Sequence, residues 1–163
     1  MKLKLCLCII SLATYALTAK AETVRVIDGD SLEIGERQIR LDGIDAPEFT
    51  QICQTTDGKD YKCGIKALHY LEKLTKDKDV TCRCLPEKDH YKREICECFA
   101  DDLSLNKALV EAGWAITYRD KTYLSSEESA KQSKRGIWQG KYMRPAIYRA
   151  LHRTEPVKTK IEP

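Results

Sequence analysis

The order of strand and helix patterns along the chain predicts an α+β domain with five short strands and about three helices. Three short strand patterns come first, a helical pattern follows, and two more strand patterns precede the last helical ones. Strands that alternate apolar and polar residues bury one face, and helices with apolar residues every three or four positions bury one side. A chain of 163 residues is long enough for one such domain.

The five strands are bounded by short turn signals. Asp28-Gly29-Asp30 separates the first two, and Gly35-Glu36 separates the next two. We expect the strands at 23–27, 31–34, 37–42, 80–85 and 94–100, with a loop at 43–47.

Three helices are expected at 62–76, 105–112 and from about 125 to 136. Asp60 is a candidate cap for the first, Gly113 ends the second, and Ser125 with Glu128 forms a candidate capping box for the third. Three strands, a helix, two strands and then helices is the order of an OB-type five-stranded barrel with additions. No element is predicted beyond Trp138, and disorder is expected over 154–163.

The N-terminus has the pattern of a secretory signal peptide. Lys2 and Lys4 precede an apolar run at 5–17, and the small residues Ala19 and Ala21 follow. The run is too short to cross a bilayer as a stable helix, and an uncleaved amphipathic anchor is the alternative. We therefore divide the chain into a signal peptide at 1–21, a folded domain at 22–140 and a basic, partly disordered extension at 141–163. A secreted or periplasmic protein is expected, with no membrane attachment after cleavage.

Net charge does not by itself imply a nucleic-acid partner. The leader holds three of the 28 basic residues and no acidic one, which leaves 25 of each in the mature chain. From Lys131 onward the chain carries nine basic residues against two acidic ones. Such a basic end can hold phosphates, although a solvated tail is the simpler interpretation.

Four carboxylates lie in turns and loops of the predicted fold. Asp28 and Asp30 flank a glycine, and Asp45 and Glu48 bracket Ala-Pro. Each pair alone is usually only a turn or a helix entry. Together they suggest a site for a hard cation, because calcium prefers several oxygen ligands.

Two arginines change the interpretation of this acidic group. Arg40 lies on a strand between Ile39 and Leu41, and Arg93 lies in the polar loop between the last two strands. A metal beside two guanidinium groups stabilises charge on a phosphate. Glu48 is then available to orient or deprotonate a water.

The chain resembles the staphylococcal nuclease, or thermonuclease, family from about Val24 to Trp138. Five blocks carry the resemblance in the family's order. They are Val26-Ile27-Asp28-Gly29-Asp30-Ser31, Ile39-Arg40-Leu41 with Gly43-Ile44-Asp45-Ala46-Pro47-Glu48, Asp89-His90-Tyr91-Lys92-Arg93, Leu109-Val110-Glu111-Ala112-Gly113-Trp114-Ala115, and Gly136-Ile137-Trp138.

The resemblance implies a calcium-dependent phosphodiesterase that cuts DNA and RNA and leaves 3′-phosphate and 5′-hydroxyl ends. It implies roles for eight residues, which we state as expectations. Asp30, Asp45 and the backbone carbonyl of Ala46 would bind Ca²⁺, with Asp28 supporting them. Arg40 and Arg93 would hold the scissile phosphate, and Glu48 would be the general base. Tyr91 would line the nucleotide site. Tyr118 is the nearest candidate for an aromatic residue that stacks on the base. We expect a monomer with nucleic acid as substrate and no stable protein partner.

Two positions depart from the family pattern. Ala46 stands where many relatives have threonine, but a backbone carbonyl does not depend on the side chain. Lys92 replaces a glycine before the second arginine. Because glycine reaches positive φ freely and lysine does not, we expect Lys92 to restrict this loop and to slow turnover.

Six cysteines follow the leader, an even number that is typical of disulfides in an exported chain. If 80–85 and 94–100 form a hairpin centred on residue 90, Cys82 faces Cys98 and Cys84 faces Cys96 on one side of the sheet. We expect Cys53–Cys63 to close the loop after Glu48. Reduction or exchange is the alternative for Cys84 and Cys96, and a four-thiolate zinc site is the alternative for the hairpin.

Two other functions fit parts of the sequence. A non-catalytic nucleic-acid-binding OB module is one, but the acidic and arginine residues that such a module does not need are present. A structural zinc-binding interaction protein is the other. A serine or cysteine hydrolase finds no support, because His69, His90 and His152 have no nucleophile motif around them.

Overall fold

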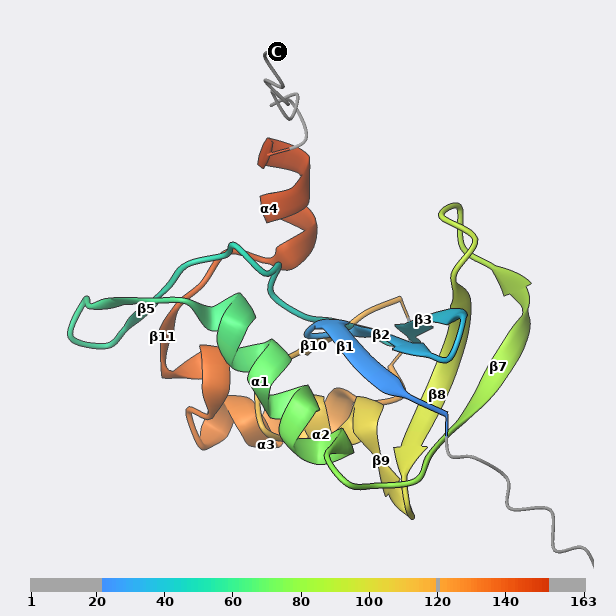
Figure 1. The fold of residues 1–163 in the computed structure, drawn as a ribbon. Helices are drawn as coiled ribbons and strands as arrows, with labels where there is room; N and C mark the ends of the chain where they lie inside the picture. Colours follow the sequence, from blue (N-terminus) through green and yellow to red (C-terminus); the bar gives the residue numbers. More distant parts are fainter. Residues whose placement is uncertain (1–21, 120, 153–163) are drawn as a thin grey trace, which may run out of the picture.

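The computed structural model describes residues 22–119 and 121–152, which form an α+β fold around a curled sheet (Figure 1). The main sheet has the strand order β1-β2-β3-β8-β7, and β9 pairs with β8. Strands β1 (Val24–Asp28), β2 (Ser31–Ile34) and β3 (Arg37–Leu41) form an antiparallel meander, and β3 runs parallel to β8 (Glu94–Ala100). This order confirms the predicted OB-type fold. The predicted leader and the tail at 154–163 lie outside the described residues.

The predicted strand faces are confirmed in β3. Ile39 and Leu41 are fully buried in the main core, whereas Arg40 between them is only partly buried and lines a pocket. The alternation of a strand therefore places one charged side chain on the face opposite the core.

The hairpin of β7 (Val80–Lys88) and β8 has the predicted register. Cys82 pairs with Cys98 and Cys84 with Cys96, and the ladder is interrupted between Cys84 and Lys88. All three predicted disulfides are present, namely Cys53–Cys63, Cys82–Cys98 and Cys84–Cys96. The six cysteines of the described chain are therefore paired, which leaves no thiolates for the alternative zinc site.

Helix α1 (Cys63–Thr75) packs against β1 and buries Ala67 and Leu71. The predicted cap was wrong, because the N-cap position is Lys62 without a side-chain hydrogen bond. Asp60 instead belongs to β6 (Asp60–Tyr61) and accepts a hydrogen bond from Gln54 of β5 (Cys53–Thr55). A small sheet, in which β5 pairs with both β6 and β11 (Gly140–Lys141), and the Cys53–Cys63 bridge fix the start of this helix.

The second helix, α2 (Leu105–Glu111), follows β9 (Leu103–Ser104) and buries the predicted apolar face. The third, α3 (Leu124–Gln132), begins one residue before the predicted capping box, and no side chain caps it. Its Glu127 is buried instead, where it accepts the Thr117 N–H of β10 (Ile116–Thr117) and pairs with Lys131.

The C-terminal part contains elements that the sequence patterns did not predict. After the short 3-10 helix η1 (Gly136–Gln139), β11 (Gly140–Lys141) joins β5, and α4 (Pro145–His152) follows. Figure 1 shows α4 projecting from the body of the molecule. Only Pro145 of this helix is buried, and its apolar residues Ile147 and Leu151 remain exposed.

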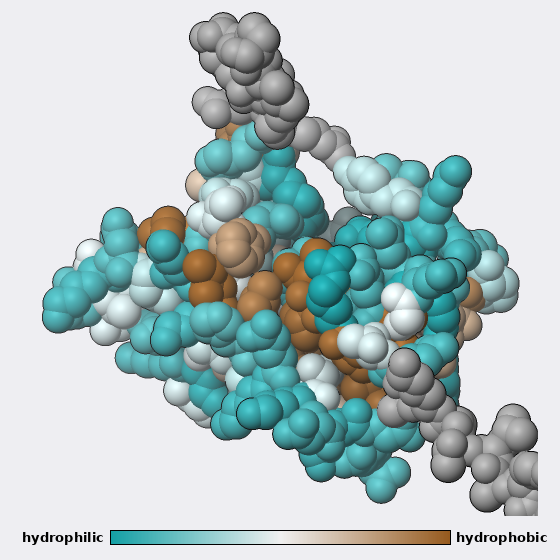
Figure 2. All heavy atoms as spheres, in the orientation of Figure 1, coloured by the Kyte–Doolittle hydropathy of each residue, from teal (hydrophilic) through white to brown (hydrophobic). Residues whose placement is uncertain are grey.

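Figure 2 shows a mostly hydrophilic face with apolar residues gathered along β1, and a hollow at the top between α4 and the β7–β8 hairpin. Among residues 22–119 and 121–152, no helix has the length and apolar character needed to span a bilayer.

Candidate active site

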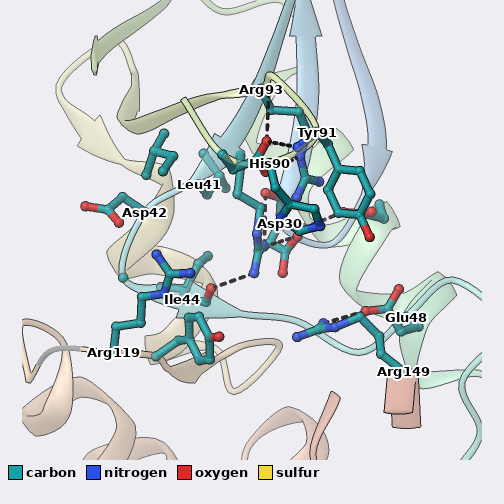
Figure 3. A pocket seen from close by; sticks show the side chains of 16 residues that line it. Asp30, Leu41, Asp42, Ile44, Glu48, His90, Tyr91, Arg93, Arg119 and Arg149 are labelled. Carbon is teal, nitrogen blue, oxygen red and sulfur yellow. Dashed lines mark hydrogen bonds and ion pairs between the residues drawn. The ribbon is translucent and has the colours of Figure 1, made fainter. Parts of the chain in front are cut away.

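A pocket of about 390 Å³ lies between the β1–β2 turn, the loop after β3, the β7–β8 hairpin loop and α4. It brings together residues that are up to 121 positions apart in the sequence, from Asp28 to Arg149. Seven of the predicted site residues line it, namely Asp28, Asp30, Arg40, Glu48, Tyr91, Arg93 and Tyr118. Figure 3 labels four of them, Asp30, Glu48, Tyr91 and Arg93, whose side chains converge from different elements.

Two buried carboxylates form the floor of the site: Asp30 lines the pocket, whereas Asp45 lies outside the lining and pairs with the lining residues Arg40 and Arg149. Asp30 is 6% exposed and Asp45 is 0% exposed. The Asp30 Oδ2 accepts the Ala46 N–H at 2.8 Å, which joins the β1–β2 turn to the loop after β4 (Ile44–Asp45). Strand β4 pairs with β10, with Asp45 opposite Ile116, so the backbone of Asp45 is held by a ladder rather than by a free loop.

Two glycines permit the close packing behind this floor. A Cβ at Gly29 would meet the Cβ atoms of Ala46 and Ala67 at 2.7 Å, and a Cβ at Gly64 would meet the Glu48 carbonyl oxygen at 1.8 Å. The absence of a side chain therefore lets α1 approach the backbone of both loops.

The Asp28 carboxyl lies behind Asp30 and accepts the Asp30 N–H at 3.0 Å through Oδ1. Burial, and then the negative charge of Asp30, raise the pKa of Asp28 to about 7. A cation beside this carboxyl would favour its charged form.

Arg40 joins the two buried carboxylates. Its guanidinium forms an ion pair with Asp30, lies 3.2 Å from Asp45 Oδ1, and donates to the Ile44 carbonyl at 3.1 Å. Burial alone would lower the pKa of Arg40, but the Asp30 charge and hydrogen bond raise it above its ordinary value. The arginine is thus fixed and charged at the pocket wall.

The hairpin loop places Arg93 opposite, and Asp89 organises that loop. Asp89 Oδ1 accepts the N–H groups of Tyr91 and Arg93 at 2.9 Å each, and Oδ2 lies 2.8 Å from Arg93 Nε. The Arg93 Nη1 donates to Ser31 Oγ at 3.0 Å. Arg93 is therefore held by a carboxylate outside the Asp30–Asp45 floor, and Asp89 is a positioning residue that sequence analysis left without a role.

The backbone of Lys92 has φ of +67°. This left-handed conformation favours glycine, because a side chain crowds the following carbonyl group and costs about 1 kcal/mol or more. Lys92 thus adopts a conformation that glycine reaches more easily, and its effect on turnover stays a prediction.

Glu48 reaches the pocket edge from the loop before β5. Buried Gln51 fixes that loop, because its Oε1 accepts the Glu48 N–H at 3.2 Å and its N–H donates to the Glu48 carbonyl at 2.8 Å. The Gln51 side chain also donates to the Met143 carbonyl at 2.7 Å, which ties the loop to the segment before α4. The polar, fully buried Gln51 was missed by sequence analysis.

Arg149 of α4 was also missed, and it pairs with two of the predicted site residues. Its Nη1 lies 2.9 Å from Asp45 Oδ1 and 2.6 Å from Glu48 Oε1, and its Nη2 lies 3.3 Å from Asp45 Oδ2. Burial raises the pKa of the Asp45 carboxyl although the hydrogen bond to Arg149 opposes this shift. An arginine 104 residues away in sequence gave no local signal of this contact.

Two tyrosines flank the pocket mouth. Tyr91 is 58% exposed, with the Arg93 guanidinium 5.4 Å from its ring centroid. Tyr118 lines the other side, with the Arg119 guanidinium 5.3 Å from its ring. Arg119, like Lys92, has a φ of +67° and lines the pocket, and sequence analysis did not include it.

The donor set fits a hard divalent cation, because the floor offers carboxylate oxygens next to the Ala46 backbone rather than nitrogen or sulfur ligands. In the described residues, the group with three potential ligand atoms within 4.8 Å is instead Cys84, Glu94 and Cys96. Two of these form a disulfide, so we assign no metal there. Asp30 and Asp45 take their counter-charge from arginines in this structure.

Comparison with known families agrees with this arrangement. Residues 38–140 match the family described as staphylococcal nuclease homologue. The chain belongs to the staphylococcal nuclease family. The match includes Arg40, Asp45, Glu48 and Arg93, and it ends before α4.

Three relatives illustrate the range of this family. The chain is 36% identical over 118 residues to the succinoglycan biosynthesis protein ExoI of Rhizobium meliloti (strain 1021), covering 69% of this chain and 61% of that protein. It is 33% identical over 124 residues to an uncharacterized endonuclease of Escherichia coli O157:H7, covering 71% and 74%. It is 28% identical over 135 residues to an uncharacterized Bacillus anthracis protein, covering 74% and 61%. The chain thus spans under two thirds of the length of two of these relatives.

Proposed function

We propose that this nuclease-family protein hydrolyses phosphodiester bonds of DNA and RNA in a calcium-dependent reaction with little sugar specificity. The observation that carries the proposal is one pocket lined by Asp30, two fixed arginines and Glu48, with the buried Asp45 paired to Arg40 of its lining. The family match and the endonuclease names of two relatives support the reaction class.

Asp30, Asp45 and the Ala46 carbonyl would hold the calcium ion, with Asp28 supporting Asp30 through its backbone hydrogen bond. When bound, the ion would polarise a phosphate oxygen and offset negative charge there. The remaining steps depend on side chains of this chain.

Arg40 and Arg93 would bind the non-bridging oxygens of the scissile phosphate from two sides. Both guanidinium groups are anchored by carboxylates, so little reorganisation is needed as negative charge develops on those oxygens. A fixed fork of N–H donors matches a phosphate better than a mobile ammonium group does.

Glu48 would accept a proton from a water molecule as that water attacks phosphorus. The new bond forms between the water oxygen and phosphorus, and the bond from phosphorus to the 5′-oxygen breaks. The 5′-oxygen leaves and takes up a proton from solvent water, and Glu48 returns its proton to solvent, so the products are a 3′-phosphate and a 5′-hydroxyl. Tyr91 and Tyr118 would flank the nucleotides on either side of this phosphate.

We also propose that the protein is exported to the periplasm or medium and acts as a monomer. The signal-peptide pattern at 1–21 supports export, and the three disulfides form and persist in such compartments.

Digestion of denatured DNA and of RNA by the oxidised protein tests the reaction directly. We expect cleavage with calcium, none with a chelator, and 3′-phosphate ends. The matched control is Glu48→Gln, which keeps the size of the side chain and should lower the rate by roughly 10²- to 10⁴-fold. A folded protein that binds nucleic acid without cleaving it would instead establish the non-catalytic OB module.

A further inference from the structure

Helix α4 delivers Arg149 to the oxygens that the proposed calcium site requires. Nη1 and Nη2 of Arg149 occupy both carboxylate oxygens of Asp45 as a fork, and Nη1 also contacts Glu48. Calcium binds such oxygens directly at about 2.3–2.6 Å. A guanidinium and a dication on the same two oxygens repel each other, so their binding is mutually unfavourable.

The contacts of α4 with the rest of the described chain are few. Beyond the Arg149 pairs, the Tyr148 hydroxyl lies 3.1 Å from Thr50 Oγ1 at an exposed position. Ile147 and Leu151 remain 50% and 60% exposed. An eight-residue helix is marginal in water by itself, so α4 depends on these contacts for its order.

The pairing with Glu48 has a second consequence. The Arg149 Nη1 lies 2.6 Å from Glu48 Oε1, so the guanidinium occupies an oxygen that a water molecule would need to reach. Arg149 therefore occupies oxygens that two of the proposed roles need, cation binding at Asp45 and contact with the attacking water at Glu48.

We propose that α4 is an autoinhibitory segment, in which Arg149 competes with a divalent cation for Asp45 and is displaced together with the helix when the cation binds. The inference rests on the proposed function, because it assigns the cation to Asp45. By linkage, whatever weakens the Arg149 contacts tightens cation binding, and cation binding frees α4.

The test uses the oxidised protein without residues 1–21 and measures two quantities. Isothermal titration calorimetry with calcium gives the dissociation constant. Hydrogen exchange at millisecond-to-second labelling times gives the protection of α4 backbone amides with and without calcium. We expect calcium to increase exchange in α4 while exchange in α1 stays the same or slows.

Arg149→Met is the variant that removes the fork and keeps an aliphatic side chain. We expect its dissociation constant for calcium to fall by roughly fivefold or more, the usual range of coupling between sites. Its α4 amides should exchange rapidly even without calcium. Arg144→Met is the matched control, because Arg144 is exposed just before α4 and outside the Asp45–Glu48 pairing. It should keep the parent affinity and exchange.

If calcium binds and α4 exchange stays unchanged, the proposal of an autoinhibitory segment is wrong, while the calcium site stands. This holds even if Arg149→Met binds calcium more tightly, because removal of a positive charge alone explains tighter binding. Weaker calcium binding by Arg149→Met would overturn it too. No calcium binding by either protein would overturn both this inference and the calcium site of the proposed function.

Discussion

Arg93 and Arg149 enter the same pocket from opposite sides, but they are held in different ways. Arg93 is anchored by Asp89 of its own hairpin loop and by Ser31, away from the Asp30–Asp45 floor. Arg149 is held by Asp45 and Glu48 themselves. Anchoring by an outside carboxylate leaves the floor free for other partners, whereas anchoring by the site carboxylates occupies them. Arg40 also pairs with Asp30 and Asp45, but it belongs to strand β3 of the main sheet, whereas Arg149 is carried by α4, of which only Pro145 is buried. Arg149 is therefore the arginine that can leave the site carboxylates together with its element.

The largest expected effect comes from exchanging each arginine for alanine. Arg93→Ala should lower kcat/KM by roughly 10²- to 10³-fold, because it removes a preorganised donor to the developing charge. Arg149→Ala should not lower kcat/KM, since Arg149 occupies the carboxylate oxygens of Asp45 and Glu48 that the reaction needs. Steady-state cleavage of a short labelled oligonucleotide measures both values. Arg83→Ala, on the same hairpin with its guanidinium 5.0 Å from the Phe99 ring, is the control for lost charge. Equal losses in the Arg93 and Arg149 variants would remove the distinction.

The two elements also differ in covalent support. Cys84–Cys96 braces the hairpin that carries Arg93, whereas α4 contains no cysteine. Replacing both cysteines by serine should lower the free energy of unfolding by roughly 2–4 kcal/mol. Denaturant unfolding measures this loss, with the Cys53–Cys63 pair replaced in parallel as a comparison. We expect the variant without Cys84–Cys96 to lose activity at a lower denaturant concentration than the parent. Identical midpoints of activity loss in the two proteins would show that this disulfide does not stabilise the hairpin.

The anchoring carboxylate of Arg93 can be tested separately. Asp89→Asn retains an oxygen for the loop N–H groups but removes the charge paired with Arg93. Because hydrogen bonds to charged groups are the stronger ones, we expect kcat/KM to fall about tenfold. Glu87→Gln changes an exposed carboxylate of the same hairpin and should leave the rate unaltered. A normal rate in Asp89→Asn would show that Arg93 needs no such anchor.

The smallest expected effect concerns the backbone that carries Arg93. Lys92→Gly should stabilise the fold by up to about 1 kcal/mol, because glycine relieves the left-handed conformation while adding some entropy to the unfolded chain. It should also raise kcat modestly. Lys134→Gly is the matched control, with φ of +50° at the end of α3, far from the pocket residues. We expect both variants to be more stable than the parent, and only Lys92→Gly to have a higher kcat. Equal kcat values in all three proteins would show that the backbone conformation of Lys92 does not limit turnover.

Much of the fold was predictable because its signals are local. The alternation in β3 placed Arg40 opposite Ile39 and Leu41, and the symmetric spacing of cysteines about residue 90 gave the pairing of the hairpin. The cap at Asp60 and the capping box at Ser125 were wrong, because strand pairing in β6 and burial of Glu127 determined where those helices begin.

The sequence by itself determined the order of the elements along the chain, the cysteine pairing and the set of acidic and arginine residues, because each depends on residue spacing within one element or on motifs in family order. Only the tertiary structure decided how Gln51 fixes Glu48, how Asp89 anchors Arg93 and that Arg149 occupies Asp45. The physical reason is the separation along the sequence between the residues that interact. A turn or a strand face is specified by neighbouring residues, whereas an ion pair across 104 residues forms only when the sheet, the Cys53–Cys63 loop and α4 have been brought together.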